Sequence, residues 1–133
     1  MATSLSAGLV IYDMLTQNEQ VMSIATRVFP VLISEDEDVR LPYVCYNRDR
    51  MLHTPVKNGG IGPDTATITV ACYAESYTQS IELAEAVRSA LEYQTYESAQ
   101  DGIVMRSCVF ADAREYADEE NHFIQELTFL IKI

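Results

Sequence analysis

The sequence predicts an α+β fold: a largely antiparallel β-sheet of about five strands with two main helices packed on one face. Five short runs are typical of strands, most clearly the apolar–polar alternation over residues 65–74, and two longer runs show the recurrence of amphipathic helices. The strands follow one another instead of alternating with helices, which favours antiparallel pairing. At 133 residues the chain fits a single domain, residues 1–133, with a full hydrophobic core.

The first predicted element is a helix over residues 5–16, with Ser4 as a suitable N-cap. Apolar residues at helical spacing define the face expected to be buried: Leu5, Leu9, Tyr12 and either Met14 or Leu15. One more helical turn is expected over residues 21–24. The chain therefore opens with helical structure before its first strand.

Two strands are predicted next, over residues 28–33 and 41–48. Pro30 cannot donate a hydrogen bond to a neighbouring strand, so the first should lie at a sheet edge or be irregular. Pro42 is tolerated because it stands at the start of the second strand. Four consecutive acids, Glu35, Asp36, Glu37 and Asp38, are expected in the loop between them.

Residues 49–64 contain three glycines and two prolines, so regular structure should not run through the whole segment. A loop of this length in a compact domain is uncommon and is often functional. Part of it can extend a hairpin that turns at Asn58, Gly59 and Gly60.

The strand over residues 65–74 has the clearest pattern, with Thr and Tyr on one face. The other face carries small and branched apolar residues: Ala66, Ile68, Val70, Cys72 and Ala74. A capping box at Ser76–Gln79 then predicts a helix over residues 77–93. Its expected buried stripe is Ile81, Ala84, Val87 and Leu91, helped by Leu83 and Ala90.

In the last third of the chain, the sequence predicts a turn at residues 100–102, a strand over residues 103–113, an acidic turn at 118–121 and a final strand. Alternating apolar residues mark the expected inner face of that strand: Phe123, Leu127, Phe129, Ile131 and Ile133. These two strands complete the sheet of about five.

Twenty acids against nine bases give a formal net charge of −11. Direct binding to nucleic-acid phosphates needs a basic face, so the charge argues against it and against an anionic membrane surface as partner. No apolar run reaches the ~20 residues that cross a bilayer. Cys45, Cys72 and Cys108 are widely spaced within strand-like runs, which predicts reduced, buried thiols.

No motif in the sequence predicts catalysis, a metal site or a cofactor. Gly59, Gly60 and Gly62 match no phosphate-binding fingerprint, and no nucleophile elbow is present. Glu120 and His122 lack the spacing of known zinc ligands and are expected in a solvated turn. We therefore expect no enzyme activity and no cofactor.

Two features of the sequence allow more than one interpretation. The acids Glu35–Asp38 fit an ordinary solvated loop, or a surface facing something that must not adhere. The eight tyrosines fit the rim of a core, or a protein–protein interface, where tyrosine is enriched.

Four segments of the chain resemble the tail completion family of tailed bacteriophages and prophages, which includes head-to-tail joining proteins. They are ATRVFPVLI, LPYVCYNRD, ATITVACYAESYTQSIELAEAVRSAL and the closing FIQELTFLIKI. The matching positions are Arg27–Pro30, Leu41–Val44, Cys72–Ala74 and, in the helix, Ala84, Ala86, Val87, Arg88, Ala90 and Leu91. The acidic block at Glu35–Asp38 departs from the family's pattern.

The resemblance implies a structural protein that forms a hexameric ring, caps the tail tube and joins it to the head connector. Its implied partners are further copies of itself, the major tail tube protein and the head connector, and DNA passes through without specific binding. It implies assembly in the bacterial host cytoplasm and residence in the virion tail. The acids Glu35, Asp36, Glu37 and Asp38 are then candidates for lining or rimming the channel. The candidate inter-subunit loop contains Met51, His53, Lys57, Asn58, Gly59 and Gly60.

Two other classes of function fit less well. An acidic adaptor or inhibitor that binds a basic partner should space its acids along one face, whereas the sequence gathers them mainly in two turns. A small enzyme should show a pocket with perturbed titratable groups.

Overall fold

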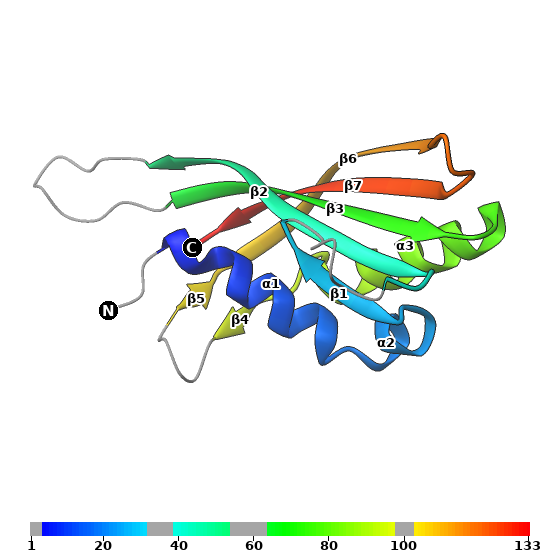
Figure 1. Ribbon diagram of the computed structural model, residues 1–133. Coiled ribbons are helices and arrows are strands. Elements are labelled where there is room, and N and C mark those ends of the chain that lie inside the picture. Colours follow the sequence, from blue (N-terminus) through cyan, green and yellow to red (C-terminus); the bar gives the residue numbers. More distant parts are fainter. Residues whose placement is uncertain (1–3, 32–38, 54–63, 98–102) are drawn as a thin grey trace, which may run out of the picture.

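The computed structural model describes residues 4–31, 39–53, 64–97 and 103–133. They form a five-stranded sheet with the strand order β1-β2-β3-β7-β6 and a separate ribbon of β4 and β5. The elements are a 3₁₀ turn (Ser4–Ser6), α1 (Ala7–Thr16), α2 (Glu19–Ile24), β1 (Arg27–Pro30), β2 (Tyr43–His53), β3 (Asp64–Ala74), α3 (Tyr77–Leu91), β4 (Tyr96–Glu97), β5 (Val104–Met105), β6 (Ser107–Ala117) and β7 (Phe123–Lys132). The helices lie on one side of the sheet (Figure 1), which confirms the predicted α+β class.

Four of the five strands pair antiparallel, and only β1 runs parallel to its neighbour β2. β1 is an edge strand and contains Pro30, as the missing N–H of proline predicts. β6 forms the opposite edge. The sheet therefore ends in two different edges, one short and one long.

The predicted loop over residues 49–64 is wrong at its start, because β2 continues to His53 and pairs with β3 as far as Asp64. A bulge between Arg48 and Arg50 lets the strand continue. The extra residue, Asp49, is held by hydrogen bonds from Asn47 Nδ2 (2.6 Å) and Thr69 Oγ1. This confirms a β2–β3 hairpin, whereas its expected turn at 58–60 lies outside the described residues.

The predicted strand over residues 103–113 is two strands, β5 and β6, and β6 runs on to Ala117. At the break between them, the backbone N–H of Arg106 donates to the carbonyl of Lys132. β5 pairs with β4 in a ribbon that the sequence did not predict. Two-residue strands carry too little alternation to be recognised from sequence.

Helix α3 begins at the predicted cap. The Ser76 side chain accepts a hydrogen bond from Gln79 N at 3.2 Å, and Gln79 reaches back to the N–H of Glu75, one residue before the capping-box position. Residues 83, 84, 87, 90 and 91 are buried as predicted, but Ile81 is 37% exposed, so its assignment to the core is wrong. Ser80, one residue earlier, is buried instead. Its hydroxyl donates a hydrogen bond to the Tyr77 carbonyl and accepts one from Gln125 Nε2.

The predicted buried face of α1 is wrong except at Leu15, which is fully buried. Leu5, Leu9 and Tyr12 are 64%, 57% and 40% exposed. The buried residues are instead Ala7, Val10, Ile11 and Leu15. Both sets recur at helical spacing, because apolar residues surround most of this helix, so periodicity could not choose between them.

Hydrogen bonds from β2 fix the orientation of α1. Tyr46 Oη donates to the Gly8 carbonyl at 2.7 Å, and Arg48 Nη1 donates to the Leu5 carbonyl at 3.1 Å. The backbone at the start of the helix is thereby held against the sheet. Leu5 and Leu9 are left on the outside.

The inner face of the sheet follows the sequence pattern closely. Ala66, Ile68, Val70, Cys72 and Ala74 are all at most 2% exposed. On β7, Leu127, Phe129 and Ile131 are buried as predicted, whereas Phe123 is only half-buried. Ile124 of β7 is also buried, although it lies on the face of the sheet away from the helices. Side chains on that face therefore pack against one another around Ile124.

Candidate interaction surfaces

The face of the sheet away from the helices, called here the open face, carries a row of aromatic and aliphatic side chains. The strand registers place them side by side across all five strands: Arg27, Tyr43, Tyr73, Ile124 and Tyr116. Tyr43 and Tyr73 stack with ring centroids 4.7 Å apart, and Phe29 meets Tyr43 edge-on at 5.8 Å. The row packs against itself, since Tyr43 is only 7% exposed without any helix above it.

Burial in this row raises the pKa of Tyr43 from 10.0 to about 12, with Tyr73, Cys45, Asp118 and Glu120 contributing in that order. A raised tyrosine pKa means that the folded state disfavours the phenolate. Its stabilising contribution is complete below pH 10 and is lost as the pH rises toward 12.

We expect the free energy of unfolding to fall between pH 10 and 12, and to fall less steeply in Tyr43→Phe, which cannot ionise at this position. Urea denaturation at pH 9 and pH 11 measures both slopes. Tyr93→Phe is the control, because Tyr93 is 78% exposed. An identical pH dependence for Tyr43→Phe and wild type would contradict the expectation.

Charged side chains lie along the β6 edge of the open face. Arg114 pairs with Glu126 at 3.1 Å and lies over the ring of Tyr116, whose hydroxyl donates to the same carboxylate. On the inner side of this edge, Tyr77 Oη and Gln125 Nε2 donate to Glu115. A recess of about 250 Å³ lies beside these groups, lined by residues 77, 115–117 and 123–125.

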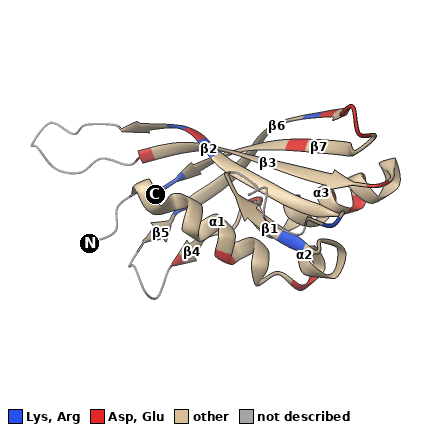
Figure 2. Ribbon diagram, in the orientation of Figure 1, with Lys and Arg blue, Asp and Glu red and all other residues tan. Residues whose placement is uncertain are grey.

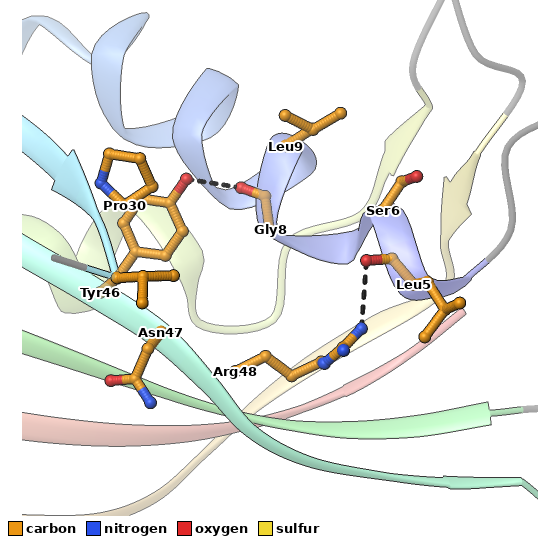
Figure 3. A pocket seen from close by; sticks show the side chains of 9 residues that line it. Leu5, Ser6, Gly8, Leu9, Pro30, Tyr46, Asn47 and Arg48 are labelled. Carbon is orange, nitrogen blue, oxygen red and sulfur yellow. Dashed lines mark hydrogen bonds between the residues drawn. The ribbon is translucent and has the colours of Figure 1, made fainter.

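A second surface is the groove between the start of α1 and strands β1 and β2 (Figure 3). It has a volume of about 320 Å³ and is lined by Leu5, Ser6, Gly8, Leu9, Pro30, Val31, Tyr46, Asn47 and Arg48. Its apolar residues are open to solvent, with Val31 70% exposed. Within this lining, Tyr46 and Arg48 donate hydrogen bonds to the backbone carbonyls of Gly8 and Leu5.

The bases of the described molecule lie mostly on the strand side (Figure 2), where eight acids also lie, whereas the helices carry almost only acids. The helical segments, residues 4–25 and 75–97, contain seven acids and a single base, Arg88. The acids are Asp13, Glu19, Glu75, Glu82, Glu85, Glu92 and Glu97. Seven of the eight described Lys and Arg residues lie in or beside the strands. The sequence analysis missed this division, because it located the acids mainly in two turns, whereas α3 brings spaced acids to one side.

The predicted inter-subunit loop is described only in part. Met51 lies in β2 opposite Ala66 and packs against the hydrophobic core. His53 is the last residue of β2, and its Nδ1 lies 2.5 Å from the Asp64 carboxylate across the hairpin. Lys57, Asn58, Gly59 and Gly60 lie outside the described residues, as do the four acids Glu35, Asp36, Glu37 and Asp38.

The three cysteines are free thiols, with Cys72 and Cys108 buried and Cys45 half-buried, close to the prediction. Burial raises the pKa of each, to about 12 for Cys108, so the thiols stay protonated near neutral pH. Within residues 4–31, 39–53, 64–97 and 103–133, no group of three or more His, Cys, Asp or Glu side chains could hold a metal ion.

The tyrosines divide between the core and the surface, and their role in a protein–protein interface stays a prediction. Tyr43 and Tyr46 are buried, whereas Tyr93 and Tyr116 are 78% and 41% exposed. The sequence analysis did not identify the exposed apolar residues of α1 as a surface, because their helical periodicity assigned them to the core.

In the part of the chain that the structure describes, none of the helices is both long and apolar enough to cross a membrane.

Comparison with known proteins supports the resemblance seen in the sequence. A family model described as "Tail completion protein gp17" matches residues 10–132. Among solved structures, the chain is similar to a chain of the "Virion of native gene transfer agent (GTA) particle", with a TM-score of 0.73 and 13% sequence identity over 98% of both chains. At this identity the likeness shows a shared fold. No curated protein matches the sequence.

Proposed function

The chain belongs to the tail completion protein gp17 family and has a structural role in a phage-type tail, and we propose that it forms a ring that caps the tail tube and joins it to the head connector. The family match over residues 10–132 is the observation that carries this proposal. The fold shared with a chain of a gene transfer agent virion agrees with it.

A ring requires two different surfaces on each subunit, one of which binds the other on the next copy. The chain offers such different surfaces in its helical layer, its open face and its two unlike sheet edges. A hexamer is the proposed stoichiometry. The hairpin loop that follows His53 and contains Lys57 and Asn58–Gly60 is proposed to reach a neighbouring subunit, as Met51 and His53 lead into it through β2.

DNA must pass through the opening of such a ring. A wall of negative charge repels phosphates and keeps the DNA from adhering. We place Glu35, Asp36, Glu37 and Asp38 at the wall or rim of this channel on the strength of their sequence. The tube protein on one side and the connector on the other are the further partners in this proposal.

Removal of the chain from a particle-producing strain tests the function. Without a cap and joint, we expect heads and unjoined tails in electron micrographs, tails of irregular length, and infectivity or transfer lower by at least about a hundredfold. Complementation with the wild-type chain restores joined particles. A chain lacking residues 58–62 should fold but restore fewer, because its contact between copies is weakened. Normal particle numbers without any copy of the chain would refute the proposal.

A further inference from the structure

We infer that neighbouring copies join through two oppositely charged surfaces: the groove between α2 and α3 of one copy and the open face of the sheet at β2 and β7 of the next. This inference rests on the proposed ring and specifies its contact. The occupant of each surface is a second copy of this chain.

The groove between α2 and α3 is lined by three apolar residues, three uncharged polar residues and two acids. It encloses about 440 Å³ and is lined by Gln20, Ser23, Ile24, Ile81, Glu82, Glu85, Ala86 and Ser89. Ile81, the residue that the sequence pattern wrongly placed in the core, is 37% exposed here. Glu82 and Glu85 are both exposed and belong to the layer of seven acids and one base.

The opposing surface, called here the cationic patch, lies on the open face away from the aromatic row. The registers place two rows side by side: Leu52, Thr65, Lys132 and Ser107, then Arg50, Thr67, Leu130 and Val109. Leu52, Leu130 and Val109 are 52%, 41% and 44% exposed. Arg50 and Lys132 are exposed, and neither pairs with an acid among the described residues.

The bulge in β2 produces this patch. Without the extra residue at Asp49, the alternation of the strand would turn Arg50 and Leu52 toward the helices. Acids do occur nearby, since Asp49 and Asp112 lie on the adjoining part of the open face. Asp49 is already bonded to Asn47 and Thr69, and Asp112 lies outside the two rows, so Arg50 and Lys132 are the charged residues of the patch itself.

The two surfaces are complementary in charge and similar in their apolar content. Each has exposed aliphatic side chains bordered by charge, acidic on the helices and cationic on the sheet. Because they lie on opposite layers of the subunit (Figure 2), a copy cannot use one surface without leaving the other for its next neighbour. The patch also adjoins the hairpin loop proposed to contact a neighbour, since Leu52 lies between Met51 and His53.

A stable contact covers about 800 Å² on each partner, about a tenth of the 8111 Å² surface of this chain. Two rows across four strands spaced about 4.8 Å apart make a centre about 15 Å wide. The charged groups at the rim set the orientation and rate of association, and the exposed aliphatic residues are removed from water.

Two charge-reversed variants test the contact. The helix variant carries Glu82→Lys and Glu85→Lys, and the sheet variant carries Arg50→Glu and Lys132→Glu. We expect wild type to associate with increasing concentration in sedimentation velocity at low ionic strength, and each variant alone to associate at least about tenfold more weakly. The control for the helix variant, Glu97→Lys with Glu119→Lys, makes the same charge change on exposed residues outside both surfaces and should behave as wild type.

An equimolar mixture of the two variants should recover association. The reversed groove of one then meets the reversed patch of the other, and the two unaltered surfaces also match, so the copies alternate. General charge repulsion predicts the opposite for the helix variant, because its net charge changes from −11 to about −7 and repulsion falls. Loss of association in the helix variant with recovery in the mixture therefore identifies this contact.

Three results would overturn the inference: variants that associate as well as wild type, a mixture that fails to recover, or a wild-type chain that stays monomeric at about 1 mM. None of these touches the proposed function, which is tested by removal of the chain from producing cells. If joined particles depend on the chain but both variants support them fully, the ring stands and this contact does not.

Discussion

Replacing Phe129 with alanine is expected to lower the free energy of unfolding by about 3–5 kcal/mol, the usual cost of removing a buried aromatic side chain. Phe129 is fully buried on the inner face of β7 and meets Phe110 edge-on at 5.7 Å. Arg88 of α3 lies over the ring of Phe110 at 4.1 Å, so the cavity would open where α3 joins the sheet. Urea denaturation followed by circular dichroism measures the loss.

The neighbouring residue on the same strand provides the control. Leu130 faces the open side and is 41% exposed, so Leu130→Ala should cost less than about 1 kcal/mol. Leu130→Ala should instead weaken association, because Leu130 lies in the cationic patch. If both alanine variants lose similar stability, the assignment of inner and open faces on β7 is wrong.

Replacing Ile11 with alanine is expected to lower the free energy of unfolding by about 2–5 kcal/mol, because Ile11 is fully buried in the hydrophobic core. Leu9, two residues earlier in the same helix, is 57% exposed, so Leu9→Ala should cost less than about 1 kcal/mol. Thermal and urea unfolding of the two variants compares the two faces directly. A larger loss for Leu9→Ala would restore the face that the sequence pattern predicted.

The expected difference in unfolding free energy between Ile11→Ala and Leu9→Ala has a functional consequence. The exposed residues Leu5, Leu9 and Tyr12 contribute little to folding, yet they keep an apolar surface beside the groove at β1. Large apolar residues in contact with water are typical of surfaces that become covered in an assembly. This agrees with a structural role for the chain.

Local patterns carried enough information for much of the fold. The alternation in β3 identified its buried face residue by residue, because a strand within a sheet has two faces and only one of them was apolar. Ser76 and Gln79 placed the start of α3, since the cap depends on side chains close in sequence. The segments resembling the tail completion family also came from sequence, and the family match confirms them.

The candidate contact surfaces depended on tertiary structure. The bulge at Asp49 decides which side Arg50 and Leu52 face, and its hydrogen bonds come from a different strand as well as from Asn47. The cationic patch joins β2, β7 and β6, whose residues 50, 132 and 109 are far apart in the chain. No local pattern contains such a neighbourhood.

By itself, the sequence determined the α+β class, the inner faces of β3 and most of α3, and the family, and it limited β1 to an edge or irregular strand. Only the tertiary structure decided which face of α1 is buried and that nearly all the described bases lie on the strand side. The physical reason is the range of the interactions. Alternation and capping act between residues a few positions apart, whereas the hydrogen bonds from Tyr46 and Arg48 that orient α1 span about forty positions of the chain.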